Sequence, residues 1–387
     1  MERTSDRHID SLDGLRGIAI LLVFFYHYLP NNDRNPFSWV ANLGWTGVDL
    51  FFVLSGFLIT GILYDTRKAT NFFKVFYARR ALRLFPLYFL AAGIVLVVGV
   101  LRHSPIGWNA IPFYIYGANL MIPLKNGVPN FTPYFNCYHF WSLALEEQFY
   151  SIWPLVVFFV ASRKTLKQIC IGGMISALVF RVVLTHLAVS FQILYTELPS
   201  RMDSLLIGAL LALTLREPGP HAWRTRTRLY SVIAVCCVIL TVLLIRAQTL
   251  VFTSSAMTSW GYSLFAAMYA CVLALALIPG TVFNRVGRLS WLRFFGRYSY
   301  GLYVWHALLL PICTRRMSWF TNHVHPLVVG QMVYAMVMLA LFTGIAYASF
   351  QLLENPFLKL KSRFRYANPE ESAARPALHT ADKVVLG

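Results

Sequence analysis

The chain has 387 residues, of which 57% are hydrophobic, 16% aromatic and 13% charged, and its formal net charge at pH 7 is +18. Soluble globular domains have about 25% charged residues, so this composition excludes a soluble globular protein and indicates a membrane protein. Nucleic-acid binding is also excluded, because the lysines and arginines form short clusters between apolar runs, as in proteins that orient themselves in a membrane. The six cysteines show no metal-ligand spacing, and we expect no metal site.

Ten apolar segments have about the length that a helix needs to cross a membrane, roughly 20 residues. They cover residues 15–29, 44–64, 84–101, 140–161, 169–189, 201–215, 230–245, 257–279, 298–313 and 327–353. The stretch 111–123 is too short and too often interrupted by proline and glycine, so we expect a loop or re-entrant piece on the outer side. The first segment has no small-residue cleavage site and should remain as the first transmembrane helix. The predicted fold class is all-α: a polytopic membrane protein of about ten transmembrane helices.

The distribution of lysine and arginine predicts the orientation, because these residues gather in cytoplasmic loops. With both termini in the cytoplasm, the outer loops hold only Arg34, Arg102, Lys125, Arg246, Arg315 and Arg316. Arg16, Arg181 and Arg201 then lie within or at the edge of membrane segments, where a charged side chain is costly and indicates a function. We expect one membrane domain over residues 1–365 and a disordered cytoplasmic tail over residues 366–387, which are polar.

The first segment carries Arg16 and His27 eleven residues apart. Eleven steps of 100° return to within about 20° of the starting direction, so both side chains lie on one helix face, roughly 16 Å apart. Arg16 is then near the cytoplasmic surface and His27 deeper. Arginine can bind a phosphate or carbonyl oxygen, and histidine suits a general base. Alone, an intramembrane histidine is more often structural, bonded to a neighbouring carbonyl.

Acidic residues at a similar depth strengthen the catalytic interpretation. Asp49 enters the second segment from the outer side, and we predict that it bonds to the far ring nitrogen of His27 and fixes its tautomer. Glu146 and Glu147 enter the fourth segment from outside and point about 100° apart, so one of them faces the cavity. We select Glu147, with the choice left open. Residues that could join this network are Trp141, Arg181, His186, Arg201, Ser299, Tyr303 and His306. A structural ion-pair network is the alternative, and we expect it for Arg201 and one glutamate.

Arg79, Arg80 and Arg83 precede the third apolar segment on the cytoplasmic side. In a helix, these spacings of three and four residues present one guanidinium face to a phosphate-bearing ligand. Taken alone, the cluster is typical of the basic residues that fix the orientation of a protein in the membrane, or of a site that binds anionic lipid. Together with Arg16 at the same depth, it favours a cytoplasmic cofactor that carries phosphates.

Taken together, these motifs resemble membrane acyltransferase family 3, bacterial O-acyltransferases that modify O-antigen, exopolysaccharide, peptidoglycan or macrolide sugars. The resemblance rests on Asp13-Gly-Leu-Arg16-Gly with His27, Gly47-Val-Asp49 through Ser55-Gly56, Arg79-Arg80-Ala-Leu-Arg83, Trp141-Ser-Leu-Ala-Leu-Glu-Glu147 and Ser299-Tyr-Gly-Leu-Tyr303-Val-Trp-His306. It covers nearly the whole chain. It implies a bacterial inner-membrane enzyme with His27 as proton acceptor and the arginine cluster at the acyl donor. Some members carry an extracytoplasmic hydrolase-like domain that this sequence lacks, so we expect direct transfer or a separate partner.

The resulting hypothesis is an O-acyltransferase that moves an acyl group, acetyl by preference, from cytoplasmic acyl-CoA to a hydroxyl of a glycan or glycosylated molecule. Its assigned residues are His27, Asp49, Glu147 and Arg16 for catalysis, Arg16, Arg79, Arg80 and Arg83 for acyl-CoA, and Arg201, Ser299, Tyr303, His306 and Trp141 for the substrate and its network. The rivals are a proton-coupled transporter or flippase and a lipid-binding sensor without turnover. The acceptor, the acyl length, a transient acyl-enzyme on Ser55 or Ser142, and the oligomeric state stay open.

Overall fold

The computed structural model describes residues 9–29, 38–103, 111–124, 134–216, 223–246, 251 and 253–367. All regular secondary structure in these ranges is helical, and they contain no strand. The helices are α1 (Asp10–Tyr28), α2 (Ser38–Leu43), η2 (Gly44–Thr46), α3 (Gly47–Thr66), α4 (Phe72–Leu101), α5 (Ile111–Tyr114), α6 (Ala118–Leu124), α7 (Phe140–Phe159), α8 (Arg163–His186), α9 (Phe191–Thr196), α10 (Leu198–Leu215), α11 (Trp223–Arg246), η4 (Met257–Gly261), α12 (Tyr262–Ala276), α13 (Val282–Gly287), α14 (Ser290–Arg297), α15 (Ser299–Leu308), α16 (Leu310–Thr314), α17 (Met317–His323), α18 (Leu327–Ser349), η5 (Phe350–Glu354), α19 (Asn355–Lys359) and η6 (Leu360–Arg363). The chain is an all-α polytopic membrane protein, as predicted.

Six stretches of the described residues are long and apolar enough to cross a membrane. They are Ala41–Thr66, Phe72–Leu101, Arg163–His186, Phe191–Leu215, Met257–Ala276 and Leu327–Arg363. Helices α1 and α7, with 19 and 20 residues, each carry charged side chains, and the apolar part of α11 is the shorter stretch Thr227–Val242. The total of ten spans and the cytoplasmic location of both termini stay predictions.

Two predicted boundaries are wrong. The predicted crossing 298–313 is not one helix: α15 ends at Leu308 and α16 begins at Leu310, where Pro311 has no N–H to continue the helical hydrogen bonds. The predicted third span, 84–101, is the C-terminal part of α4, which starts at Phe72. The cluster of three arginines is therefore part of the helix rather than of a loop before it. The stretch 111–123 holds only the short helices α5 and α6.

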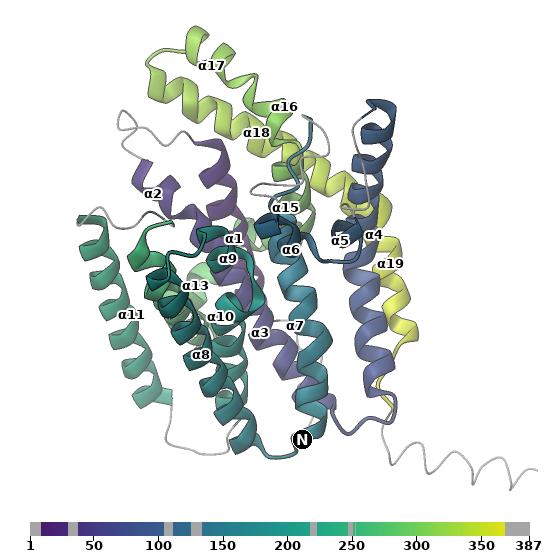
Figure 1. Ribbon diagram of the computed structural model, residues 1–387, viewed down its shortest axis with the longest axis vertical. Coiled ribbons are helices and arrows are strands. Elements are labelled where there is room, and N and C mark those ends of the chain that lie inside the picture. Colours follow the sequence, from purple (N-terminus) through teal and green to yellow (C-terminus); the bar gives the residue numbers. More distant parts are fainter. Residues whose placement is uncertain are drawn as a thin grey trace, which may run out of the picture.

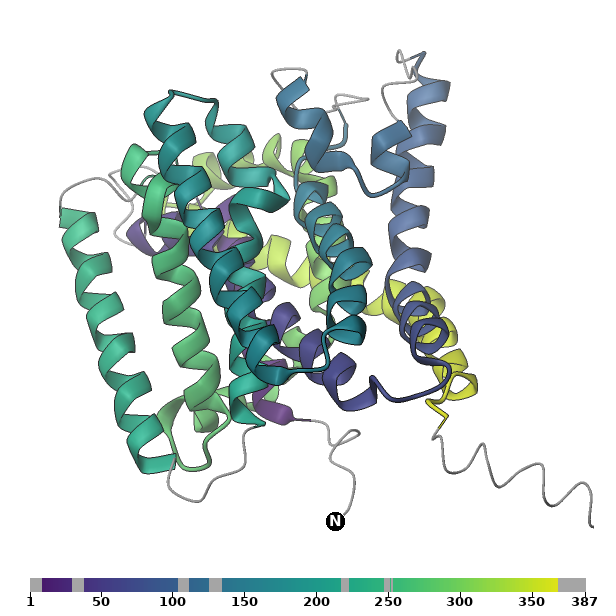
Figure 2. The same cartoon turned by 60° about the horizontal axis from the view of Figure 1, so that its bottom comes forward.

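Figure 1 shows α4 and α19 side by side along one edge of the molecule and α11 along the opposite edge, with α3, α7, α8 and α10 between them. Helices α16 to α18 lie together at one end, and the chain continues from α18 through η5 into α19, which packs along α4. The turned view in Figure 2 keeps α4 and the C-terminal helices adjacent. The last described residues thus return to the start of α4.

Glycines allow two of the helix pairs to approach closely. A Cβ atom on Gly56 of α3 would lie 1.9 Å from the carbonyl oxygen of Leu205, and one on Gly208 of α10 would lie 2.1 Å from that of Val53. In membranes, lipid tails are as apolar as the side chains, so burial of apolar surface contributes little to helix association. Small residues then promote association because they let the helix backbones pack closely. Likewise, a Cβ on Gly17 of α1 would lie 2.0 Å from the carbonyl oxygen of Leu292. The glycines of two family-like motifs therefore serve helix packing.

The end of the described chain packs against the start of α4. The side chain of Asn71 donates a hydrogen bond to the carbonyl oxygen of Arg365 at 2.9 Å and accepts one from the N–H of Ala367 at 3.0 Å. Tyr366, between these two anchored residues, is partly buried. The first two residues of the expected tail thus contact the membrane domain, and residues 368–387 lie outside the described residues.

Candidate functional site

A cavity of about 460 Å³ lies among α1, α3, α4, α7, α15 and the C-terminal segment, which runs from α19 to Ala367 and contributes Lys361 and Tyr366. The side chains that line it are Arg16, Val48, Phe51, Phe52, Leu54, Ser55, Leu58, Ile59, Ile62, Phe76, Arg79, Arg80, Arg83, Leu84, Ser142, Leu143, Glu146, Ser299, Tyr300, Tyr303, Lys361 and Tyr366. Its volume lies in the range of small-molecule sites. All four arginines that the sequence assigned to the donor line this one cavity, together with Ser299 and Tyr303.

The four arginines differ in what neutralises them. Nη1 of Arg16 lies 2.9 Å from Oδ1 of Asp13 in the same helix. Arg80 stands 3.5 Å above the ring of Tyr150, with Nε 3.5 Å from a carboxylate oxygen of Glu147. Among the described residues, by contrast, no acid forms an ion pair with the other two arginines or with the lysine of η6, namely Arg79, Arg83 and Lys361. An anionic ligand would find its charge partners mainly on these three.

Glu146, and not the selected Glu147, lines the cavity. Its Oε1 accepts a hydrogen bond of 2.8 Å from the hydroxyl of Ser55 on α3, which also bonds to the hydroxyl of Tyr150. Its Oε2 lies 4.0 Å from Nη2 of Arg80. The two adjacent glutamates therefore share one arginine and compensate its charge.

Two buried hydroxyls lie at another part of the cavity wall. The oxygens of Ser142 on α7 and Tyr303 on α15 are 2.5 Å apart, and both lie within hydrogen-bond distance of the carbonyl oxygen of His139. Each hydroxyl has one proton, so one of them donates to the carbonyl and the other to its neighbour. Both residues are buried, whereas Arg83 is an exposed residue.

His27 is not a cavity-lining residue; it lies near the C-terminal end of α1 and is partly exposed. Its Nδ1 is 2.8 Å from the carbonyl oxygen of Val23, one turn earlier. A carbonyl only accepts, so Nδ1 carries the proton and Nε2 is the basic nitrogen of the neutral ring. The predicted contact with Asp49 is wrong, because Asp49 bonds to Arg201 and Ser204 instead, and the backbone of α1 fixes the tautomer of His27.

Further rings connect His27 with the cavity wall. The centroid of the His27 ring lies 5.1 Å from that of His306, which in turn lies 5.8 Å from Tyr303 and 6.2 Å from His139. Nδ1 of His306 is bonded to its own helix, 2.8 Å from the carbonyl oxygen of Leu302, and its Nε2 has no hydrogen-bond partner among the described residues. The predicted residues His27, His306 and Tyr303 are thus brought together, with His139 as a member that sequence reasoning missed.

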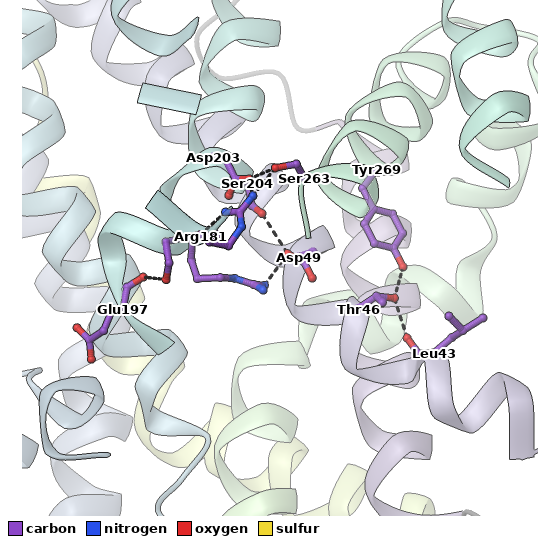
Figure 3. A network of polar contacts seen from close by, with 11 residues as sticks. Leu43, Thr46, Asp49, Arg181, Glu197, Asp203, Ser204, Ser263 and Tyr269 are labelled. Atoms are coloured by element: carbon purple, nitrogen blue, oxygen red, sulfur yellow. Dashed lines mark hydrogen bonds and ion pairs between the residues drawn. The ribbon is translucent and has the colours of Figure 1, made fainter. Parts of the chain in front are cut away.

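Asp49 and Arg201 belong to a separate buried network. Figure 3 shows Asp49 of this network near Arg181, Asp203 and Ser204. Nη2 of Arg201 lies 2.6 Å from Oδ1 of Asp49, which also accepts a 3.0 Å hydrogen bond from Ser204. Beside it, Nη2 of Arg181 lies 2.8 Å from Oδ2 of Asp203. These four charged side chains are buried and do not line the cavity. The structural ion pair expected for Arg201 is present, but its partner is an aspartate rather than a glutamate.

Trp141 does not line the cavity either. Its ring packs at 4.8 Å against Tyr195 and at 5.9 Å against Phe52, and it is buried. Its position is that of a packing residue between α7, α3 and α9. In the part of the chain that the structure describes, no group of His, Cys, Asp or Glu could hold a metal ion.

Comparisons with known proteins assign the chain to a family. Residues 9–351 match a family model described as an acyltransferase domain. The peptidoglycan O-acetyltransferase OatA of Listeria monocytogenes is 31% identical over 382 residues, and the O-acetyltransferase OatA of Staphylococcus aureus is 28% identical over 378 residues. Each alignment covers 92% of this chain but only 57% and 58% of the two relatives, so the chain spans little more than half their length.

No solved structure matches the chain. The family match nevertheless includes every helix that forms the cavity except the C-terminal segment with Lys361 and Tyr366. It also contains the helix with Arg16 and His27 and the helix with the arginine cluster, the features on which the resemblance was based. On this extent of agreement, the chain belongs to membrane acyltransferase family 3.

Proposed function

We propose that this chain is an integral-membrane O-acyltransferase of a bacterial inner membrane, which moves an acetyl group from cytoplasmic acetyl-CoA to a hydroxyl of a cell-envelope glycan. The observation that carries the proposal is that basic side chains of α1, α4 and η6 line one cavity. Coenzyme A bears three phosphates, and clustered guanidinium groups bind phosphate strongly. The names of the two relatives, both O-acetyltransferases and one of them acting on peptidoglycan, support acetyl as the group and a glycan as the acceptor.

The donor would enter with its phosphates on Arg16, Arg79 and Arg83. The acyl-pantetheine arm then runs along the apolar wall that Phe51, Leu54 and Leu58 of α3 provide, toward the hydroxyls of Ser142 and Tyr303. Arg80 plays a different part in this proposal: two glutamates compensate its charge, so it shapes the cavity wall rather than binding phosphate.

Nε2 of His27 would accept the proton of the acceptor hydroxyl. The acceptor oxygen attacks the thioester carbonyl, the carbon–sulfur bond breaks, and coenzyme A leaves as a thiolate that takes up a proton. In the structure the single proton of the Tyr303 hydroxyl goes to Ser142 or to the carbonyl oxygen of His139. During attack the hydroxyl would turn and donate this proton to the oxygen that becomes negative, while Ser142 donates to the carbonyl of His139. The ring of His306 contacts both His27, outside the cavity lining, and Tyr303, within it. The acceptor would therefore approach His27 from the side opposite the donor.

The test uses the purified chain in nanodiscs with radiolabelled acetyl-CoA and a panel of glycan acceptors that includes peptidoglycan fragments. His27→Ala should abolish transfer while the protein stays folded. His323→Ala is the matched control, since His323 also has Nδ1 2.8 Å from a carbonyl one turn earlier, that of Trp319, but is exposed on α17. Transfer by the chain alone would establish direct transfer, and acetyl-CoA consumption that needs a second protein would establish a separate extracytoplasmic partner. A wild type that consumes no acetyl-CoA under either condition would overturn the proposal in favour of a transporter.

A further inference from the structure

The C-terminal segment from α19 to Ala367 forms one wall of the cavity, although it follows residue 351, where the family match ends. Helix α19 and η6 pack on α4, and the side-chain amide of Asn71 holds the end of the segment at the start of that helix through two hydrogen bonds to the backbone of Arg365 and Ala367. Two of its side chains, Lys361 and Tyr366, line the cavity. The segment is thus placed beside the arginines of α4.

Lys361 brings a cation to a place that is already positive. Arg16, Arg79 and Arg83 line the same cavity. Arg16 is paired with Asp13, but among the described residues Arg79, Arg83 and Lys361 form no ion pair with an acid. These like charges repel one another, and a polyanionic ligand would remove that repulsion. This arrangement indicates a ligand with more than one phosphate group.

Tyr366 adds an aromatic face to the same wall. The guanidinium carbon of Arg79 lies 6.0 Å from the centroid of its ring. Burial raises the pKa of its hydroxyl, so the side chain stays neutral and can donate a hydrogen bond. Nucleic-acid bases commonly stack on aromatic rings of this kind.

We propose that Lys361 and Tyr366 form a subsite for the nucleoside end of the acyl donor, with Lys361 on the 3′-phosphate and the Tyr366 ring against the adenine. The inference rests on the proposed function, because it takes acyl-CoA as the donor. Adenine and the 3′-phosphate are attached to one ribose, and one short segment supplies both a ring and a cation to match them. The pyrophosphate remains for Arg16, Arg79 and Arg83 on α1 and α4.

The test measures equilibrium binding of coenzyme A and of 3′-dephospho-coenzyme A to the full chain in nanodiscs. A hydrogen-bonded contact with a charged group contributes about tenfold in affinity. Wild type should therefore bind coenzyme A about tenfold more tightly than the dephospho form, and Lys361→Ala should lose that preference through weaker binding of coenzyme A alone. Lys359→Ala is the matched control, since Lys359 is exposed on α19 and does not line the cavity. Tyr366→Leu should weaken both ligands by the same factor.

The outcomes separate the two proposals. Tight binding of both ligands by wild type and unchanged binding by Lys361→Ala would overturn the subsite and leave the acyltransferase proposal intact. Equal weakening of both ligands in Lys361→Ala would also overturn it, because Lys361 would then contact the pyrophosphate. Binding of neither ligand by wild type would overturn the donor and the subsite together.

Discussion

Arg181 and Arg201 lie inside the helix bundle, and each has a carboxylate within 3 Å, whereas Arg79 and Arg83 line the cavity with no such partner among the described residues. The first pair is buried, and Arg83 is exposed. A buried charge is tolerated only when it is paired, so the first arrangement holds helices together. Cations that stay accessible and lack an acid are available to a ligand. The comparison therefore indicates a structural role for Arg181 and Arg201, and it leaves Arg79 and Arg83 for the proposed binding of the donor.

The largest expected effect is the loss of stability when a buried arginine, Arg181 or Arg201, is separated from its aspartate. Arg201→Ala leaves Asp49 buried without its cation, and loss of one partner of a buried ion pair costs about 3–5 kcal/mol. Thermal unfolding in detergent should show the loss as a lower midpoint. Arg83→Ala, a change of the same kind in the cavity, should leave the midpoint nearly unchanged.

A double variant, Asp49→Leu with Arg201→Met, tests the reason for that loss. Replacing both charges by apolar groups removes the desolvation cost, so much of the stability should return. If the double variant is as unstable as Arg201→Ala, loss of packing rather than of charge compensation explains the effect.

The next effect concerns catalysis within the cavity. Tyr303→Phe removes the hydroxyl proposed to stabilise the developing negative charge, and such a donor contributes about 100-fold or more to kcat. Acetyl-CoA affinity should change little, because the proposal places the phosphates at the arginines rather than at Tyr303. Tyr300→Phe is the control: Tyr300 is on the same helix and lines the cavity, but its hydroxyl donates at 2.7 Å to the carbonyl oxygen of Leu84, whereas the hydroxyl of Tyr303 has that of Ser142 beside it. Equal kcat values for the two variants would contradict the role of Tyr303.

The two sets of arginines were not equally predictable from the sequence. The clustering of Arg16 with Arg79, Arg80 and Arg83 follows from helical spacing and from the rule that places basic residues at one membrane surface. The sequence also indicated that Arg201 needs an acidic partner. It could not identify Asp49, because that pairing depends on the close approach of α3 and α10 at Gly56 and Gly208.

Other residues of the site show why local patterns are incomplete. The bond of His27 to Val23 joins residues four apart in one helix, so it could have been predicted in place of the contact with Asp49. Lys361 and Tyr366 gave no signal, since they reach the cavity only because the chain end folds back on α4 and bonds to Asn71. Contacts of this kind depend on the whole fold.

A smaller effect, on acetyl-CoA binding, tests the two cavity arginines without an acidic partner among the described residues, Arg79 and Arg83. Arg79→Ala and Arg83→Ala should each weaken acetyl-CoA binding about tenfold, the contribution of one charged hydrogen bond, without lowering the unfolding midpoint. Arg315→Ala, an exposed arginine away from the cavity, is the control. Raising the ionic strength should also weaken binding by wild type, because salt screens attraction between accessible charges. Salt-independent binding would contradict the assignment of these arginines to phosphates.

The smallest effect concerns Asn71, whose side chain holds the C-terminal segment against α4. Asn71→Ala removes both hydrogen bonds to the chain end, each contributing about 0.5–1.5 kcal/mol, so the segment with Lys361 and Tyr366 should detach more often. Acetyl-CoA affinity should fall by less than tenfold, since the arginines of α1 and α4 remain. Asn71→Asp keeps the acceptor for the N–H of Ala367 and loses the donor to the carbonyl of Arg365, so its affinity should lie between those of wild type and Asn71→Ala. If Asn71→Ala weakens binding as much as Arg79→Ala does, the wall and the arginines act as one unit, and the separation of the nucleoside and pyrophosphate subsites does not hold.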